Sequence, residues 1–368
     1  MTQSILRVLI QEKLAHGRFP RTHIPRTWGG PRNGKGLLRG LTLAAFAALG
    51  TMTCVASAGA ATAITECMTL STFSGAYVLA NDLASCGGTC LEVANDRITI
   101  DLAGHTIAGP LDERNQGLCS DAGVGAGITT DSGTARQVTT IKNGTITGFF
   151  GDGINLDLST RNLILNLTSS FNSGGGIFVG ARSLVKGCVI ADNGGNGITI
   201  GDFGQIQDCE ITGNAGGFGI FGGHHMLVKD NIVSGNQLGI NVGDFGTVTY
   251  NESSKNTFRG LFSGNRSLVT GNTTNENGIG YDEAGIATGG LSSVTYNFSN
   301  QNGGGGIDVA LGGPFEGTRS LVTGNITNRN GGIGVAASCP STVTNNRSLD
   351  NGLMNYDIGK GCHSTNNK

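Results

Sequence analysis

The chain has 368 residues, 64 of which are glycine, and a formal net charge of −2. Glycine does not recur at every third position, so the composition excludes a collagen helix. Residues 61–368 carry 16 basic and 25 acidic residues, a net charge of −9, because eight basic residues and one acid lie in residues 1–60. This charge disfavours nucleic acids, anionic membranes and polyanionic ligands as partners, unless a cation such as calcium bridges the two; no other cofactor is indicated.

Residues 1–60 have the composition of an export signal with an amino-terminal extension. The basic residues come first, an apolar run follows at 41–55, and small residues at 56–60 offer cleavage sites. The apolar run is shorter than the ~20 residues that a membrane span needs. We expect a secreted, periplasmic or cell-surface protein with no stable membrane insertion after cleavage. An uncleaved anchor is the alternative.

The folded part is expected to begin with an N-terminal cap at 61–97, followed by repeats at 98–368. The first repeat segment, at 98–109, is Ile-Thr-Ile-Asp-Leu-Ala-Gly-His-Thr-Ile-Ala-Gly. A polar segment rich in glycine and aspartate follows at 110–135 and predicts an exposed loop. The regular repeats begin after this loop.

The repeats are defined by the segment Arg-Ser-Leu-Val-Thr-Gly-Asn, which occurs at 266–272 and returns unchanged at 319–325. Looser copies give a period of about 21 or 22 residues. Six periods also contain a Gly-apolar-x-apolar unit, and the last two of these units are read at Ile307/Val309 and Ile333/Val335. Such alternation is typical of a short strand. Leucine is too sparse for a leucine-rich repeat. The sequence therefore predicts an all-β parallel β-helix of about twelve coils, with one period in each coil.

One asparagine recurs in most coils at the same repeat position. Asparagine tolerates the left-handed conformation, so we expect it to occupy a tight corner, with its amide bonded to the asparagines of the neighbouring coils. The residues at this position are Gly144, Leu167, Cys188, Cys209, Asn231, Asn251, Asn272, Asn297, Asn325, Asn346 and Asn367.

The string at 98–109, followed by coils rich in glycine and asparagine, resembles bacterial exported right-handed parallel β-helix repeat proteins. These proteins are neighbours of the pectin-lyase-like fold and of the NosD-like periplasmic proteins. The resemblance covers about residues 64–368. It implies a right-handed helix and a role on polysaccharides.

Eight cysteines follow the export segment, and export favours disulfides. Cys188 and Cys209 share a ladder position on consecutive coils and are one expected pair. Cys339 and Cys362 are a second. The remaining four leave three pairings open, and these are Cys67, Cys86, Cys90 and Cys119.

Stacking in register places Asp202, His224 and Asp244 in one column. Two carboxylates about 9.6 Å apart would suit an inverting pair, so these three residues are the candidate catalytic residues. The same column offers His224 as a ligand for a divalent cation. The alternative is structural, because aspartate and glycine are common corner residues.

Ligand binding is expected from basic and aromatic residues that repeat along the coils. Arginines at the start of their repeats suit the carboxylate of an acidic sugar, or else are solvated cations. The only tryptophan lies in the export segment, so sugar stacking must use tyrosine or phenylalanine. The candidate ligand-binding residues are Arg182, His225, Tyr250, Arg266 and Tyr296.

Three functions are consistent with these features. The first is binding of a polysaccharide or cell-surface glycan by a monomer, with processing of that polymer left open. The second is a non-catalytic, adhesin-like rod, which the lack of an Asp-Asp pair and of a Gly-His-Gly element favours. The third is a NosD-like role in metal maturation, and the lack of a methionine- and histidine-rich track argues against it.

Overall fold

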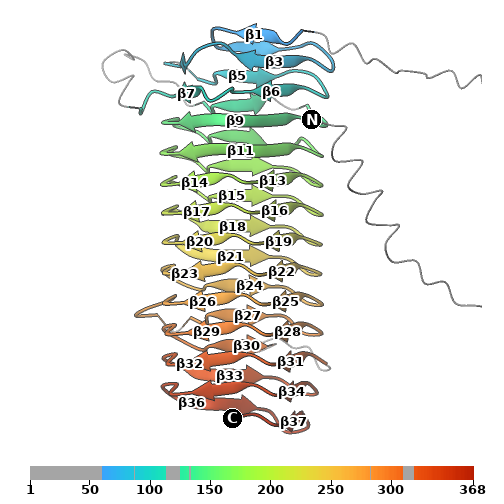
Figure 1. Cartoon of the computed structure of the whole chain (residues 1–368), viewed down its shortest axis with the longest axis vertical. Helices are drawn as coiled ribbons and strands as arrows, with labels where there is room; N and C mark the ends of the chain where they lie inside the picture. The colour runs from blue at the N-terminus through green and yellow to red at the C-terminus, as the bar shows by residue number, and fades with distance from the viewer. Residues whose placement is uncertain (1–59, 87, 113–124, 132–133, 282, 310–318) are drawn as a thin grey trace, which may run out of the picture. The chain divides into compact units, whose positions relative to one another are not determined.

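The computed structural model describes residues 60–86, 88–112, 125–131, 134–281, 283–309 and 319–368. Residues 1–59 of the export segment and Cys119 lie outside these residues. The described residues form parallel strands and no helix, and thus no helix that could cross a membrane. The strands build a solenoid of about twelve turns, as predicted (Figure 1).

One sheet, here called sheet B, has one strand in each coil. Its strands are β2 (Met68–Leu70), β5 (Leu91–Val93), β8 (Ile128–Thr130), β10 (Ile154–Leu156), β12 (Ile177–Val179), β15 (Ile198–Ile200), β18 (Phe218–Gly222), β21 (Leu238–Val242), β24 (Leu261–Ser263), β27 (Ile286–Thr288), β30 (Ile307–Val309), β33 (Ile333–Ala337) and β36 (Met354–Ile358).

The other sheet, sheet A, bends into two wings. The first wing contains β1 (Thr62–Ile64), β3 (Ala76–Leu79), β6 (Thr99–Asp101), β13 (Leu184–Lys186), β16 (Gln205–Gln207), β19 (Leu227–Lys229), β22 (Thr247–Thr249), β25 (Leu268–Thr270), β28 (Ser293–Thr295), β31 (Leu321–Thr323), β34 (Thr342–Thr344) and β37 (His363–Thr365). The second wing contains β4 (Leu83–Ala84), β7 (Thr106–Ala108), β14 (Val189–Ala191), β17 (Glu210–Thr212), β20 (Ile232–Ser234), β23 (Glu252–Ser254), β26 (Thr273–Asn275), β29 (Phe298–Asn300), β32 (Ile326–Asn328) and β35 (Arg347–Leu349). Two longer strands, β9 (Thr140–Thr147) and β11 (Leu163–Ser170), span both wings.

The predicted positions of two strands of sheet B are wrong. The loop expected at 110–135 contains β8, which pairs with β5 and β10 and buries Ile128 completely. In β33, Val335 and not Ile333 lies beside Ile307, because Gly334 takes the place of the glycine that begins the unit. The segment 61–97 carries β1 to β5, which join the same two sheets as the later strands.

Three corners join the strands of each coil. The first separates the two wings, the second follows the second wing, and the third leads from sheet B to the first wing. A residue in the left-handed conformation occupies each corner, for example Tyr250, Lys255 and Phe245. The ladder asparagine was expected there, but it is the next residue: Asn251 follows Tyr250 and points inward, 2% exposed.

Inward asparagines carry the predicted hydrogen-bond ladder. The backbone N–H and the Nδ2 of Asn251 both donate to Oδ1 of Asn272, each at 3.0 Å, and Asn272 donates in the same way to Asn297. Burying a corner is costly unless its backbone groups are paired, and each amide satisfies the coil before it. The second corner has an equal ladder that the sequence analysis missed, formed by Asn172, Asn193, Asn214, Asn236, Asn256, Asn277, Asn302, Asn330 and Asn351.

The disulfides confirm part of the cysteine predictions. Cys339 and Cys362 are bonded, and Cys67 pairs with Cys90, which settles one of the open choices. Cys86 is also disulfide-bonded. The disulfides lie in the N-terminal region and near the C-terminal end of the described coils.

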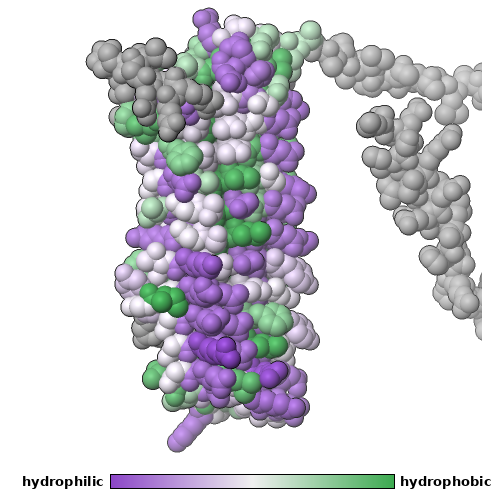
Figure 2. All heavy atoms as spheres, turned by 60° about the vertical axis from the view of Figure 1, so that its left-hand side comes forward, coloured by the Kyte–Doolittle hydropathy of each residue, from purple (hydrophilic) through white to green (hydrophobic). Residues whose placement is uncertain are grey.

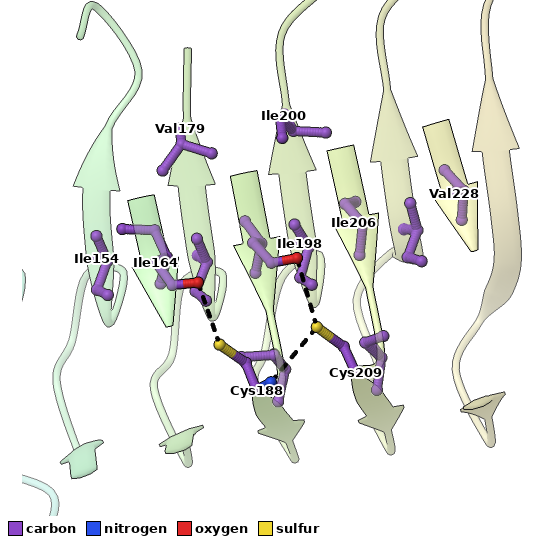
Figure 3. Close-up of a cluster of buried hydrophobic side chains, with 14 of the residues drawn as sticks. Ile154, Ile164, Val179, Cys188, Ile198, Ile200, Ile206, Cys209 and Val228 are labelled. Carbon is purple, nitrogen blue, oxygen red and sulfur yellow. Dashed lines mark hydrogen bonds between the residues drawn. The ribbon is translucent and has the colours of Figure 1, made fainter. Parts of the chain in front are cut away.

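The expected pair Cys188 and Cys209 is wrong, because both thiols are free and buried. Both side chains point the same way along the ladder (Figure 3), and their hydrogen bonds follow the pattern of the ladder asparagines. The Sγ of Cys209 accepts from the N–H of Cys188 at 3.4 Å and donates to the carbonyl of Val185 at 3.8 Å. The hydrogen bond with Cys188 and burial raise the pKa of the Cys209 thiol, so the thiol stays protonated.

We predict that Asn272→Ala destabilises the protein by about 3 kcal/mol, since it leaves the N–H of Asn251 buried and unpaired. The loss is measured as a shift in urea-induced unfolding. The control is Thr273→Ala, because Thr273 is the next residue in the chain and its side chain is partly exposed on β26. This variant should change stability by less than about 0.5 kcal/mol. Equal effects of the two variants would contradict the role of the ladder.

Candidate functional site

The predicted catalytic residues do lie in one column, at the end of sheet B beside the third corner. Oδ1 of Asp202 accepts the backbone N–H of His224 at 2.8 Å, and Nδ1 of His224 accepts that of Asp244 at 3.0 Å. Oδ1 of Asp244 accepts the N–H of Asn265 at 2.7 Å. We call these four residues the acceptor column, because each side chain satisfies the backbone of the next coil.

This arrangement gives the column a structural role and leaves its catalytic role a prediction. The bond from Asp244 fixes the proton of neutral His224 on Nε2, and Asn265 shows that an amide serves as well as a carboxylate. No group of three or more histidine, cysteine, aspartate or glutamate residues with metal-binding geometry occurs among the described residues. Nδ1 of His224 is already engaged with the backbone, so a cation would have to use Nε2.

Three predicted ligand-binding residues meet in the adjacent column at the third corner. His225 stacks between Phe203 and Phe245, with ring centroids 4.7 and 4.6 Å apart. The guanidinium groups of Arg182 and Arg266 close the two ends, 5.4 and 5.5 Å from the phenylalanine centroids. The ring faces thus contact one another, and the stack exposes ring edges to solvent. This arginine-aromatic column suits a contact at its edges better than a stacked sugar.

Tyr250 and Tyr296 lie at a different corner, the first. They are 60% and 64% exposed. Each ring covers the glycine at the same corner of the next coil, where a Cβ on Gly271 or Gly324 would come within 2.6 Å of the ring. Tyrosine and glycine therefore alternate along this corner. The two rings are two coils apart, about 9.6 Å by strand spacing.

The outer face of sheet B carries aromatic residues that the sequence analysis did not single out. The residue between the two buried positions of each strand points outward, and register places Phe178, Thr199, Phe221, Asn241 and Phe262 side by side on five consecutive coils. We call this the phenylalanine column. Phe221 is 40% exposed and the other two rings are half-buried. The signal was present as the variable letter of the Gly-apolar-x-apolar unit.

On one side, the phenylalanine column is bordered by the turns that precede the strands of sheet B. Phe218 packs beside Phe221 with a centroid distance of 5.1 Å. Arg259 lies 5.7 Å from the ring centroid of Phe262 and forms an ion pair with Glu283 at 2.8 Å. The phenylalanine column is thus a strip one residue wide, with these turns on one side and the acceptor column on the other.

Comparison with known proteins agrees with this geometry. The family model described as "Right handed beta helix region" matches residues 69–225 and 124–274, which together span more than half of the chain. The chain belongs to this family. No curated protein sequence matches it.

Solved structures with the right-handed β-helix fold include the A-module of the mannuronan C-5 epimerase AlgE6 of Azotobacter vinelandii. It has 13% sequence identity and a TM-score of 0.50 and covers 82% of this chain and 85% of the module. The periplasmic alginate epimerase AlgG has 13% identity and a TM-score of 0.44, covering 79% and 77%. The Dettilon tailspike protein has 16% identity and a TM-score of 0.39, covering 83% and 60%. At such identities the likeness concerns the fold alone.

This right-handed β-helix also has a polar hollow of about 500 Å³ over the second corner of its C-terminal coils. Figure 2 brings the second wing forward and shows hydrophilic residues on this face of the C-terminal coils. Arg329 and Arg347 have no carboxylate within ion-pair distance among the described residues. The hollow is lined by Asn275, Glu276, Asn300, Gln301, Asn328, Arg329, Arg347, Leu349 and Asp350.

We predict that Asp244→Asn leaves stability unchanged within about 0.5 kcal/mol, because an amide oxygen can still accept the N–H of Asn265. Asp244→Ala should cost about 1 kcal/mol, because it removes that acceptor. Thermal unfolding of the two variants measures the difference. Equal losses in both would show that the charge, and not the acceptor, matters to the fold.

Proposed function

We propose that this chain is an exported polysaccharide-binding protein that holds its polymer along the outer face of sheet B. The observation that carries the proposal is the phenylalanine column, in which three partly exposed rings recur on alternate coils of one straight face. Aromatic rings bind sugars by contact with their apolar faces, and a regular row of rings suits a regular polymer. A structure with the same fold, the A-module of the mannuronan C-5 epimerase AlgE6, is named for action on a polysaccharide, which supports this proposal.

Polar groups beside the rings would orient the sugar hydroxyls. Thr199 and Asn241 lie between the phenylalanines, and Nδ2 of Asn196 donates to Oγ1 of Thr199 at 3.0 Å. The acceptor column runs parallel on the third-corner side. The candidate ligand-binding residues Arg182, His225 and Arg266 would then contact groups that project past that edge, while Tyr250 and Tyr296 would serve a separate contact at the first corner.

The disulfides support the expected secreted, periplasmic or cell-surface location, since disulfides persist in oxidising compartments. In this proposal residues 1–60 direct export, residues 61–97 close the amino-terminal end, and residues 98–368 present the binding faces. The protein acts as a monomer.

The binding proposal is tested with the triple variant Phe178→Ala, Phe221→Ala and Phe262→Ala. Each ring should contribute roughly 1 kcal/mol, so the triple variant should bind about a hundredfold more weakly. Calorimetry or affinity electrophoresis against a panel of neutral and acidic polysaccharides, with and without calcium, measures the loss. Phe298→Ala is the control, because Phe298 is a comparably exposed strand residue, 46%, on sheet A. Unchanged binding by the triple variant would contradict the proposal.

A second candidate function is processing of the bound polymer by Asp202, His224 and Asp244, because the acceptor column borders the phenylalanine column. If the protein cleaves a polysaccharide, Asp202→Asn and Asp244→Asn should each abolish cleavage, since an amide cannot transfer a proton as a carboxyl does. Mass spectrometry of the incubated polymer follows the reaction. Full cleavage by both variants would exclude these residues, and thermal unfolding of both variants checks that a loss of cleavage does not come from a lost fold.

A further inference from the structure

We infer that the phenylalanine column selects an uncharged, extended polysaccharide with a twofold ribbon conformation, such as a β-1,4-linked hexose polymer, over five consecutive sugar units. The inference rests on the proposed function and specifies its ligand. It follows from the spacing of the rings, the residues between them and the charges that border them.

The spacing of the rings sets the conformation of the polymer. Phe178, Phe221 and Phe262 lie on every second coil, so neighbouring rings are two coils, or about 9.6 Å, apart. One coil rise is close to the length of one pyranose unit in an extended chain. In a twofold ribbon every second sugar presents the same face, so units one, three and five would lie on the three rings. A polymer that coils with another period loses this match after the first ring.

The residues between the rings fit the intervening sugars. Thr199 and Asn241 are polar and shorter than phenylalanine, so they suit a sugar turned by half a revolution, which would place its hydroxyl groups over them. An aromatic residue at either position would obstruct that sugar. The alternation of ring and small polar residue thus repeats the alternation of the ribbon.

The charges near the column disfavour a polyanion. The column itself contains no charged residue, and neither Asn155 before it nor Ala287 after it is charged. On the third-corner side the acceptor column contributes the carboxylates of Asp202 and Asp244, which would repel a uronate. On the other side, Arg259 is neutralised by Glu283.

The arginines of the third corner do not reverse this balance. Arg182 and Arg266 lie at the third corner, beyond the acceptor column, where each contacts a phenylalanine of the arginine-aromatic column. Residues 61–368 also have a net charge of −9. Electrostatics near the face and over the whole surface therefore favour a neutral ligand.

The test is calorimetric titration of the purified protein with oligosaccharides of two to six units. Three series are compared: neutral extended (β-1,4-linked glucose or mannose), charged extended (β-1,4-linked mannuronate) and neutral coiled (α-1,4-linked glucose). For a neutral extended series we expect the affinity to rise about fivefold from two units to three and again from four to five, with little change at four and six. The charged and coiled series should bind at least tenfold more weakly at five units.

The variant Phe221→Ala sharpens the test. Without the middle ring a trisaccharide reaches one phenylalanine only, so the rise at three units should disappear while the rise at five remains. Phe298→Ala should keep both rises. Binding of the charged or coiled series as tight as the neutral extended ones, or a smooth dependence on length, would overturn this inference and leave polysaccharide binding intact. No binding to any series or to the wider polysaccharide panel would overturn the proposed function as well.

Discussion

The structure depends on the pairing of buried corner amides from one coil to the next. A solenoid turns its chain three times in every coil, and each turn exposes backbone groups to an interior without water. In most coils the inward side chain after the corner meets this need: asparagine at the first and second corners, and serine in several coils at the third. These contacts hold the coils in register, and the register aligns every column on the outer surface.

The period and the alternation were sufficient to predict the fold. Two identical seven-residue segments defined the coil, and the glycine-led units located most strands of sheet B. The prediction failed where the sequence pattern allowed two registers for the same strand. Ile333 and Val335 both alternate around a small residue, and only pairing with Ile307 shows which of them enters the core. The strand at Ile128 was not predicted, because the polar residues before it interrupt the repeat period.

The cysteines show why spacing alone does not establish a bond. Cys188 and Cys209 have the separation of neighbours in a ladder, as Cys339 and Cys362 nearly do. Within the ladder, however, identical positions impose the same side-chain direction, so one thiol follows the other instead of facing it. The sequence also placed Asp202, His224 and Asp244 correctly in one column, but it could not show that the acceptor column binds backbone N–H groups or that the ring faces at the third corner cover one another. Both depend on side-chain direction.

The acceptor column has a consequence for how such a protein changes over evolutionary time. Aspartate, histidine and asparagine occupy equivalent places on successive coils, and each meets the same backbone requirement. A substitution among them alters the charge and proton-transfer capacity of one coil while the chain path stays the same. Duplicated coils can therefore diverge chemically one at a time, so a single ancestral repeat could give rise to a surface with a different specificity at each step along its length.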